Sequence, residues 1–581
     1  MNLNVSNRNG RTYLYIEKGY RDENGKVKKK NVMKLGYVDE LEKDYEDPIA
    51  HFREVAKKMT EDEKQNRRIT LLIDMNEDLL PGSAGAKNFG YALLLRVYHE
   101  IGLDKFLKGK AQCEKFEFNT NSIMILLVIS RLLSPGSKAR AYEEKNRYFE
   151  RFDFSLDDVY RSLTHFDNIS KDIQRYSHES VKAKYGSDTS IIYYDVTNYY
   201  FEIKKPDDLR KHGVSKEKRK KPIVQCGLAM DNFGIPLQYE LFPGNISDKE
   251  TFRTVIGDVR KNYDTGRIVV VADMGIITGD NIHYLVGDKP EKPRNGYIFS
   301  FSIRGGAAAF QKYVLSEEGY TDRNGRPVTE ETDYKIKSRL VAREINVTMD
   351  SGRKQKTKTV YEKQVVFWNK KYCIKARAER AEIIAKAEAL IADPKKYTKA
   401  TSYGAAAYVS NLEFDKKTKE VLDTGKLLSL DAKKIEEEEK YDGYYSIVTS
   451  ELHMSDSEIV EKYRGLWEIE ETFKVTKSDL EARPIYVSDR THINGHFLTC
   501  FIALKIIRVI QKIMGRKYSA EKIIECLNKI ECVNEQENLY LFGYRSEISE
   551  ELGTTFGIDF TKKRLRLAEI KNILGGVKKN K

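Results

Sequence analysis

Two acidic residues stand where the sequence pattern makes a carboxylate costly or well placed for chemistry. Asp195 interrupts the strand-like apolar run 191–198, and a charge there is unfavourable unless it is paired or bound to a metal. Asp273 ends the apolar run 268–272, which is typical of a central strand in an α/β sheet, and ligands bind beyond the carboxyl ends of such strands. Ordinary explanations exist for both: an edge strand whose acid faces water, and a helix cap.

A third acid, Glu470, lies in a segment with helical periodicity. The segment begins at Ser455, and Ser455 and Glu458 have the spacing of a capping box. One helical face is predicted to hold Ile459, Tyr463, Trp467, Glu470, Lys474 and Lys477, which recur at steps of three or four. The alternative is an amphipathic helix with a charged, exposed turn.

Together, two strand acids and one helix acid can hold two Mg²⁺ ions about 4 Å apart. One ion would activate a water or a DNA 3′-hydroxyl, and the other would stabilise the leaving oxygen. Hard oxygen ligands suit Mg²⁺, with Mn²⁺ as a substitute, rather than zinc. Lys474 and Lys477, one helical turn apart, would hold a phosphate beside these ions.

A basic segment follows the Asp195 strand directly. Residues 204–221 contain nine Lys or Arg and three Asp or Glu. Such a loop would meet DNA phosphates near the acids, although a solvated Lys-rich loop is an ordinary feature. Its candidate phosphate contacts are His212, Lys216, Lys218, Arg219 and Lys220.

The composition favours a polyanionic partner. The chain has 581 residues, enough for several domains, and a net charge of +13. Its six cysteines form no CxxC pair, so a zinc site or disulfide framework is not expected. The polar start lacks a signal peptide pattern, and the longest apolar runs are shorter than the ~20 residues of a membrane span. We therefore expect a cytoplasmic protein without membrane contact.

Changes in hydrophobic periodicity and composition along the sequence predict an α/β protein with six segments. The hairpin Arg11–Lys18 and Lys28–Leu35 turns at Asp22–Gly25, and Thr357–Lys375 reads as a second hairpin across residues 369–371. The segments are a hairpin and helix (1–75, with the helix from Pro48 to Gln65), a mostly helical region (76–185), an α/β core in two parts (186–302 and 441–515), a β-rich insertion (303–440) and a helical tail (516–581).

Several blocks, in this order, resemble the DDE-type transposases of bacterial insertion sequences. They are Tyr194-Asp195-Val196-Thr197, His212-Gly213-Val214-Ser215-Lys216, Phe242-Pro243-Gly244-Asn245 with Asp248, Val271-Ala272-Asp273-Met274-Gly275, and Tyr463 through Lys477. The chain is most similar to the group whose ribonuclease-H-like core is interrupted by a β-rich insertion. The resemblance covers most of 186–510, and it implies that fold here.

This resemblance also implies roles for individual residues. Asp195, Asp273 and Glu470 would be the three metal-binding catalytic acids. The family's last signature, Tyr-x₂-Arg-x₃-Glu-x₆-Lys, is matched by Tyr463, Glu470 and Lys477. Leu466 stands at the Arg position, so phosphate handling by that arginine is not implied for this chain.

The resemblance implies duplex DNA as the partner. Members bind the terminal inverted repeats of their element as a dimer, hydrolyse its ends and join the 3′-hydroxyls to target DNA. Region 76–185 is then expected to bind DNA ends and the tail 516–581 to dimerise. Some members stack a flipped base on an insertion-domain aromatic. Trp368, the Trp of the 303–440 segment, is the candidate, with a core strand residue as the alternative.

Three other functions fit part of the pattern. A nuclease on the same core would cut without joining, and a DNA-binding derivative would do neither. A two-carboxylate hydrolase such as a glycosidase would need no metal. The basic loop and the helix lysines argue against this last class.

Overall fold

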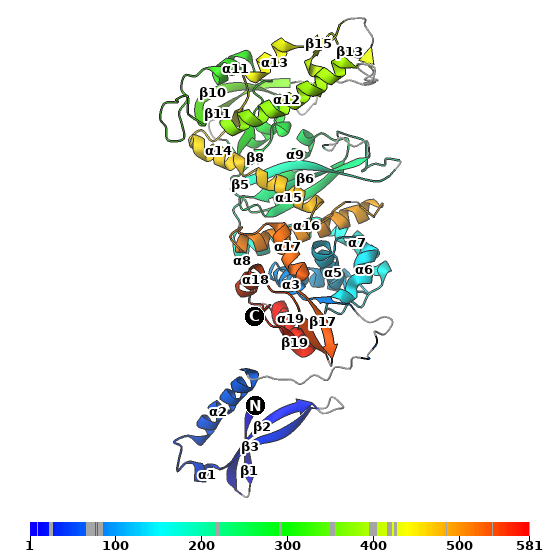
Figure 1. Cartoon of the computed structure of the whole chain (residues 1–581), viewed down its shortest axis with the longest axis vertical. Coiled ribbons are helices and arrows are strands. Elements are labelled where there is room, and N and C mark those ends of the chain that lie inside the picture. Colours follow the sequence, from blue (N-terminus) through cyan, green and yellow to red (C-terminus); the bar gives the residue numbers. More distant parts are fainter. Residues whose placement is uncertain are drawn as a thin grey trace. The chain divides into compact units, whose positions relative to one another are not determined.

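The computed structural model describes most of the chain. The described residues are 1–8, 10–21, 27–65, 76, 78, 85–114, 116–203, 205–214, 216, 221–289, 293–348, 355–393, 404–414, 421–422, 427–483, 485–536 and 538–579. They belong to two compact units, Met1–Ser83 and Ala84–Lys581 (Figure 1).

The N-terminal unit is an antiparallel three-stranded sheet with a helix on one face. Its elements are β1 (Asn2–Arg8), β2 (Arg11–Arg21), β3 (Val27–Tyr37), α1 (Val38–Leu41) and α2 (Pro48–Gln65), with sheet order β1-β2-β3. Alternation along β2 buries Leu14 and Ile16, and α2 buries Phe52 and Ala56. The predicted hairpin and helix are confirmed, whereas the turn at 22–25 lies outside the described residues.

The larger unit is built on a mixed eight-stranded sheet in the order β10-β11-β16-β9-β8-β5-β6-β7. Strands β5, β6 and β7 are antiparallel neighbours, whereas β5, β8 and β9 run parallel. The strands are β5 (Ile191–Tyr200), β6 (Ile223–Asp231), β7 (Pro236–Pro243), β8 (Val269–Ala272), β9 (Gly296–Ser300), β10 (Tyr334–Thr348), β11 (Gln355–Asn369) and β16 (Tyr444–Thr449).

Helices cover both faces of this sheet, as its long apolar strands require. On one face, even-numbered residues of β5 such as Ile192 and Tyr194 pack against α9 (Asp248–Asn262) and α10 (Gly279–Val286). On the other face, Ile191 and Tyr193 share a core with α14 (Asp456–Arg464), α15 (Trp467–Lys477) and α16 (Arg490–Ile513).

Helix α16 is the centre of the larger core. It lies between the sheet and the helical region (Figure 1). The helices of that region are α3 (Tyr91–Glu100), α4 (Leu103–Glu114), α5 (Thr120–Leu133), α6 (Lys138–Glu143), η1 (Glu144–Arg147), α7 (Leu156–Asn168) and α8 (Ser170–Tyr185). By length and composition α16 could cross a membrane, but 94% of its apolar stretch is buried inside the protein, as in a core helix.

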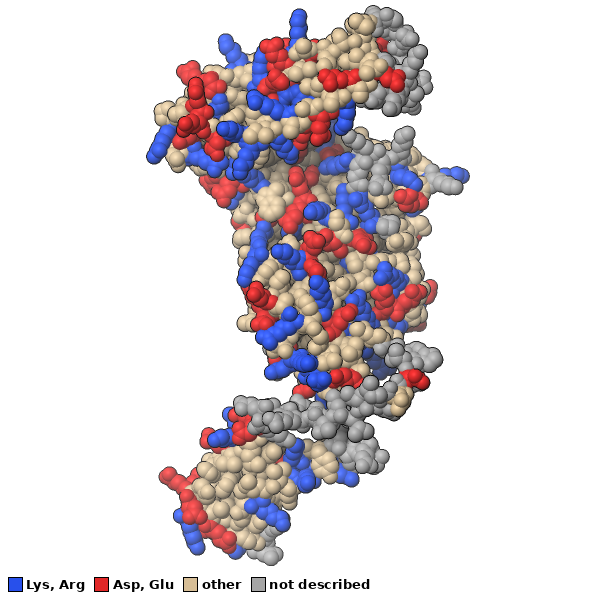
Figure 2. Space-filling model, in the orientation of Figure 1, with Lys and Arg blue, Asp and Glu red and all other residues tan. Residues whose placement is uncertain are grey.

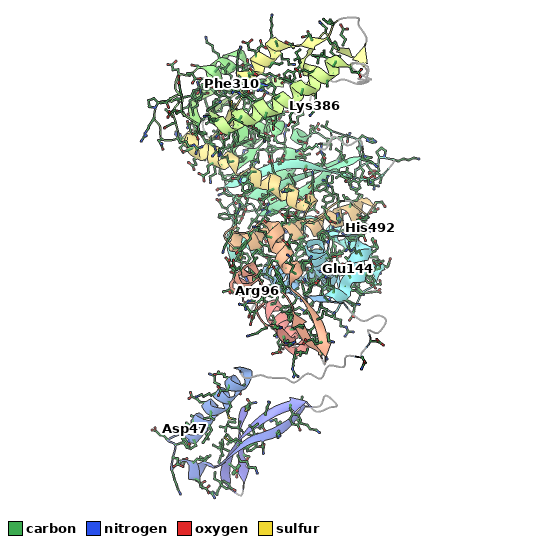
Figure 3. All side chains as sticks on the ribbon, viewed as in Figure 1. Asp47, Arg96, Glu144, Phe310, Lys386 and His492 are labelled. Atoms are coloured by element: carbon green, nitrogen blue, oxygen red, sulfur yellow. The ribbon has the colours of Figure 1, made fainter. Side chains whose placement is uncertain are left out.

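The 303–440 segment extends the main sheet. Strand β10 pairs with β11, and β11 pairs with β16. The predicted hairpin across 369–371 is wrong, because the Asn369 side chain accepts the Lys371 N–H and caps a helix there. The remaining elements are α11 (Ala308–Leu315), with Phe310 in a small core (Figure 3), α12 (Lys370–Ala392), η4 (Gly404–Tyr408), β12 (Val409–Ser410), β13 (Glu413–Phe414), β14 (Val421–Leu422), β15 (Ser429–Leu430) and α13 (Ala432–Glu439).

The C-terminal segment, predicted to be helical, also contains strands. Its elements are α17 (Ala520–Lys529), β17 (Glu531–Gln536), β18 (Leu539–Phe542), α18 (Glu547–Phe556), β19 (Arg564–Arg566) and α19 (Leu567–Lys578). The strands form a sheet in the order β19-β18-β17-β4, whose last member, β4 (Lys87–Asn88), comes from the beginning of this unit. Short polar strands with so distant a partner leave no clear periodicity in the sequence.

Candidate active site

The register of the main sheet brings Asp195 and Asp273 together. Strand β5 pairs in parallel with β8, with Tyr193 opposite Val271. Two residues further along the same register, Asp273 is level with Asp195, and in-register neighbours of parallel strands share a face. Continuing the pairing of β8 with β9 in the same way adds Ser300 to this row. The two predicted strand acids therefore meet on the face covered by α14 and α15.

Asp195 is the more enclosed of the two acids, with a side chain 21% exposed. Burial raises its pKa to about 6, and the charges of Asp248 and Asp273 add to that rise. Lys216 opposes the rise, because its ammonium lies 3.6 Å from Asp195 Oδ1 and 3.8 Å from Asp248 Oδ2. A carboxylate crowded by two other acids has the electrostatic setting of a cation site.

Asp273 lies at the surface, immediately after β8 and before the short helix η2 (Met274–Ile276). Its Oδ1 accepts hydrogen bonds from Ser300 Oγ at 2.6 Å and from the Met274 N–H at 2.7 Å. The Tyr463 hydroxyl lies 3.5 Å from the same oxygen. Among the described residues, all hydrogen bonds to this carboxylate reach Oδ1.

The helix predicted to carry Glu470 is broken in two. Around Gly465 and Leu466 the backbone makes i→i−3 bonds, from Leu466 N to Tyr463 O and from Ile469 N to Leu466 O. A close approach lies at this break, since a Cβ on Gly465 would lie 2.1 Å from Tyr193 Oη. The predicted continuous helix is therefore wrong, and the shared face of its six residues stays a prediction.

The break separates the six residues of that predicted face. Ile459 in α14 is fully buried, whereas Trp467 in α15 is 54% exposed. Tyr463, near the end of α14, still reaches Asp273. The helical spacing in the sequence continues through the break, so periodicity alone did not reveal it.

Glu470 is exposed on α15 and lies near the other acids through Tyr463. Burial raises the pKa of Tyr463, and the charges of Asp273 and Glu470 raise it further. The hydroxyl is therefore a neutral donor that contacts Asp273 and feels the charge of Glu470. Among the described residues no three His, Cys, Asp or Glu side chains converge closely enough to hold one metal ion. The donor chemistry of Asp195 and Asp273 fits Mg²⁺, but in this structure Glu470 does not close the site.

The two predicted phosphate lysines lie further along α15. Lys477 is half-buried, with its ammonium 5.5 Å from the centre of the Tyr199 ring. Lys474 is exposed. Burial raises the pKa of Asp479, and the nearby charge of Lys474 opposes that rise. The Lys474 side chain is thus near Asp479, which follows the end of α15.

Tight backbone packing holds part of the basic segment 204–221 beside Asp195. A Cβ on Gly213 would lie 1.8 Å from Gly244 O, so the two glycine-containing blocks touch directly. Asn198 Nδ2 also donates to Val214 O at 3.3 Å. His212 is exposed. The predicted contacts Lys218, Arg219 and Lys220 lie outside the described residues.

A cavity of about 320 Å³ opens beside Asp273. Its wall includes Ser300, Arg304, Tyr372, Tyr445 and Tyr463. Sequence reasoning found only Tyr463 among these five and did not assign Asp248 to the site. Ser300 follows from the sheet register and Asp248 from its place in a motif block. No sequence motif pointed to Tyr372 or Tyr445, because these residues are far apart in the sequence and only the folded chain brings them to the same cavity.

Trp368 is not among the residues that line that cavity, although it contacts Asp442 of its wall. It is half-buried on β11, and its indole N–H donates to Asp442 O at 2.9 Å. The ring lines a different cavity of about 680 Å³, together with Tyr320 and Lys335. A base-stacking role for Trp368 therefore stays a prediction.

Two protein families match this chain. Residues 187–506 match the family described as Transposase DDE domain, and residues 3–69 match the family described as IS1634 family transposase, N-terminal domain. A solved structure, the cryo-EM structure of piggyBac transposase synaptic complex with hairpin DNA, is 8% identical, with 85% of this chain and 88% of that chain covered and a TM-score of 0.36. No curated protein matches the chain.

Proposed function

Because this chain belongs to the DDE-type transposases of insertion sequences, we propose that it binds its element's terminal inverted repeats, cleaves the DNA ends and joins their 3′-hydroxyls to target DNA. The observation that carries the proposal is the pairing of Asp195 and Asp273 by sheet register. Their shared face also holds Ser300, and Lys216 lies beside Asp195.

The topology of the sheet supports a ribonuclease-H-like core. Counted from β5 in chain order, the strands β7-β6-β5-β8-β9 are arranged 3-2-1-4-5. The first three strands are antiparallel and the last two join β5 in parallel. Strands β16, β11 and β10 then extend this core at one edge.

In this proposal Asp195 and Asp273 would hold Mg²⁺, with Glu470 as the third ligand. Bound Mg²⁺ supplies an activated water and neutralises charge on the leaving oxygen. The protein's own groups orient the site. Ser300 and Met274 N–H hold Asp273 in one orientation, and Lys216 balances Asp195 and Asp248.

The cavity beside Asp273 supports a DNA substrate. It brings the Arg304 guanidinium to the same wall as the acid, and it exposes the rings of Tyr372 and Tyr445. Arg304 offers a cation that Leu466, buried in the core, does not supply. Aromatic rings and a cation beside a carboxylate suit bases and phosphates more than a neutral sugar.

The test compares Asp195→Asn with Asp264→Asn, a fully exposed aspartate after α9. Labelled DNA carrying the element's ends is incubated with each protein and Mg²⁺, Mn²⁺ or EDTA. Asp195→Asn should abolish metal-dependent cleavage and joining while DNA binding persists, and Asp264→Asn should behave as the wild type. Full cleavage by Asp195→Asn would exclude this aspartate from the site.

The same assay separates the alternatives. Cleavage without joined products identifies a nuclease, and binding without cleavage in either metal identifies a non-catalytic DNA-binding protein. Cleavage in EDTA would contradict metal dependence. The proposal includes a homodimer on the paired ends, since two ends must be joined together. Cross-linking with and without end DNA measures it.

A further inference from the structure

Among the described residues of the N-terminal unit, one face of the sheet is not covered by a helix. On β2, alternation sends Leu14 and Ile16 toward the buried side and Tyr13 and Tyr15 toward the opposite side. Residues paired across an antiparallel sheet share a face. The uncovered face, which we call the polar sheet face, therefore contains Asn2, Asn4, Ser6, Tyr13, Tyr15, Asn31 and Lys34.

The polar sheet face is rich in groups that read base edges. Asn side chains can bond adenine in two places, and lysine contacts guanine. Asn31 and Lys34 are both exposed on β3. The acid of this face, Glu17, is only 8% exposed and pairs with Lys29 at 2.5 Å. Its charge is thus compensated and does not oppose an anionic partner.

The charge of the unit is divided between its sheet and its helices. Residues 1–37 contain nine Lys or Arg and three Asp or Glu, whereas residues 38–65 contain five Lys or Arg and ten Asp or Glu. Figure 2 shows acidic side chains gathered on one edge of this unit. The acidic excess lies mainly in residues 38–47, with six Asp or Glu and one Lys, whereas α2 itself is balanced, with four Lys or Arg and four Asp or Glu. The basic excess of the unit lies in its sheet, so the sheet is the side that suits DNA.

The width of the three-stranded sheet also fits the major groove of DNA. Neighbouring strands lie about 4.8 Å apart, so three strands span about 10 Å, close to the ~12 Å width of the major groove. In the larger unit, by contrast, α5 buries nearly all of its side chains and offers no reading surface. End binding by α7 or α8 stays a prediction.

We propose that the polar sheet face enters the major groove of the element's terminal repeat and reads its sequence, with Asn31 contacting a base and Lys34 a phosphate or guanine. This inference rests on the proposed function, because only an enzyme that acts on its own element's ends needs such a reader. The N-terminal unit would then select the end, and the larger unit would cut it.

The experiment uses the full chain and two duplexes, one taken from the end of the encoding element and one scrambled duplex of the same composition. Affinities are measured over a series of salt concentrations for Asn31→Ala and Lys34→Ala. Lys57→Ala, which removes an exposed lysine on α2 and not on the sheet, is the matched control.

Asn31→Ala should lower affinity for the end duplex about tenfold and leave the scrambled duplex unchanged, as expected for one lost base contact. Lys34→Ala should weaken binding and reduce the salt slope by about one counterion. Lys57→Ala should do neither. If Asn31→Ala fails to fold, judged by its melting temperature, Asn4→Ala on β1 replaces it.

Unchanged affinity and salt slope in both face variants would overturn the inference. So would a change in oligomeric state without a change in DNA affinity, since it would identify β3 as a protein interface. The proposed function is judged separately, by wild-type cleavage and joining at saturating protein. If the wild type joins DNA ends but the face variants bind DNA normally, only the recognition of the repeat by the polar sheet face is refuted, and the proposed function stands.

Discussion

At the scale of single residues, Tyr463 links the acids of the candidate site. Its hydroxyl lies 3.5 Å from Asp273 Oδ1, and burial together with the charges of Asp273 and Glu470 raises its pKa, so it remains protonated at neutral pH. Tyr463→Phe removes one hydrogen bond to a charged group, a contact of about 1.5–3 kcal/mol. End cleavage should therefore slow roughly 10- to 100-fold, measured under single-turnover conditions.

The control for that change is Tyr486→Phe, because Tyr486 is 65% exposed. It should leave the cleavage rate unchanged. The melting temperature of Tyr463→Phe should stay near that of the wild type, since the ring is kept. A normal cleavage rate in Tyr463→Phe would mean that the hydroxyl does not orient Asp273.

At the scale of elements, the break between α14 and α15 coincides with a close approach of the chain to Tyr193. A Cβ at position 465 would lie 2.1 Å from Tyr193 Oη and 2.6 Å from Tyr193 Cζ. Gly465→Ala should therefore destabilise the protein by about 1–3 kcal/mol, the usual cost of overpacking. Denaturant unfolding measures this change.

A second substitution tests the cause. Tyr193→Phe removes the nearest clashing atom, so the double variant Gly465→Ala, Tyr193→Phe should recover part of the lost stability. Purely additive effects would show that Tyr193 does not impose the break. Because the break sets where Glu470 points, Gly465→Ala should also reduce cleavage.

The elements also show what the sequence could reveal. Long periodic segments were predictable, as α2 and the strands carrying Asp195 and Asp273 confirm. The break at Gly465 was not, because a helical period runs through it and Tyr193, which the chain approaches there, is distant in sequence. The helix beginning at Lys370 was missed for a related reason, since Asn369 suits both a turn and a helix cap. Ser300 and Tyr445 join the cavity only through strand pairing.

At the scale of the whole molecule, the larger core is built around a helix that carries a buried cation. Lys505 of α16 is fully buried, and its ammonium donates to Ser177 Oγ at 2.7 Å. Burial lowers the pKa of Lys505 to about 7. Lys138, whose ammonium lies 2.8 Å from His496 Nδ1, has its pKa lowered to about 7 for the same reason. Folding is therefore coupled to release of protons from two lysines.

The sign of this coupling predicts a pH dependence of stability. Between pH 7 and the ordinary lysine pKa of 10.5, each of these two lysines binds more protons in the unfolded chain than in the folded one, so their contribution to the free energy of unfolding should rise with pH across this window. Below pH 7 both states are protonated and the destabilisation, at most about 5 kcal/mol for each lysine, is complete.

Lys505→Met should therefore stabilise the protein most below pH 7. It should also flatten the rise of the free energy of unfolding with pH, leaving the part due to Lys138. Lys386→Met, on exposed α12 (Figure 3), should change neither. An equal effect of Lys505→Met at pH 6 and pH 10 would show that Lys505 stays charged in the folded protein.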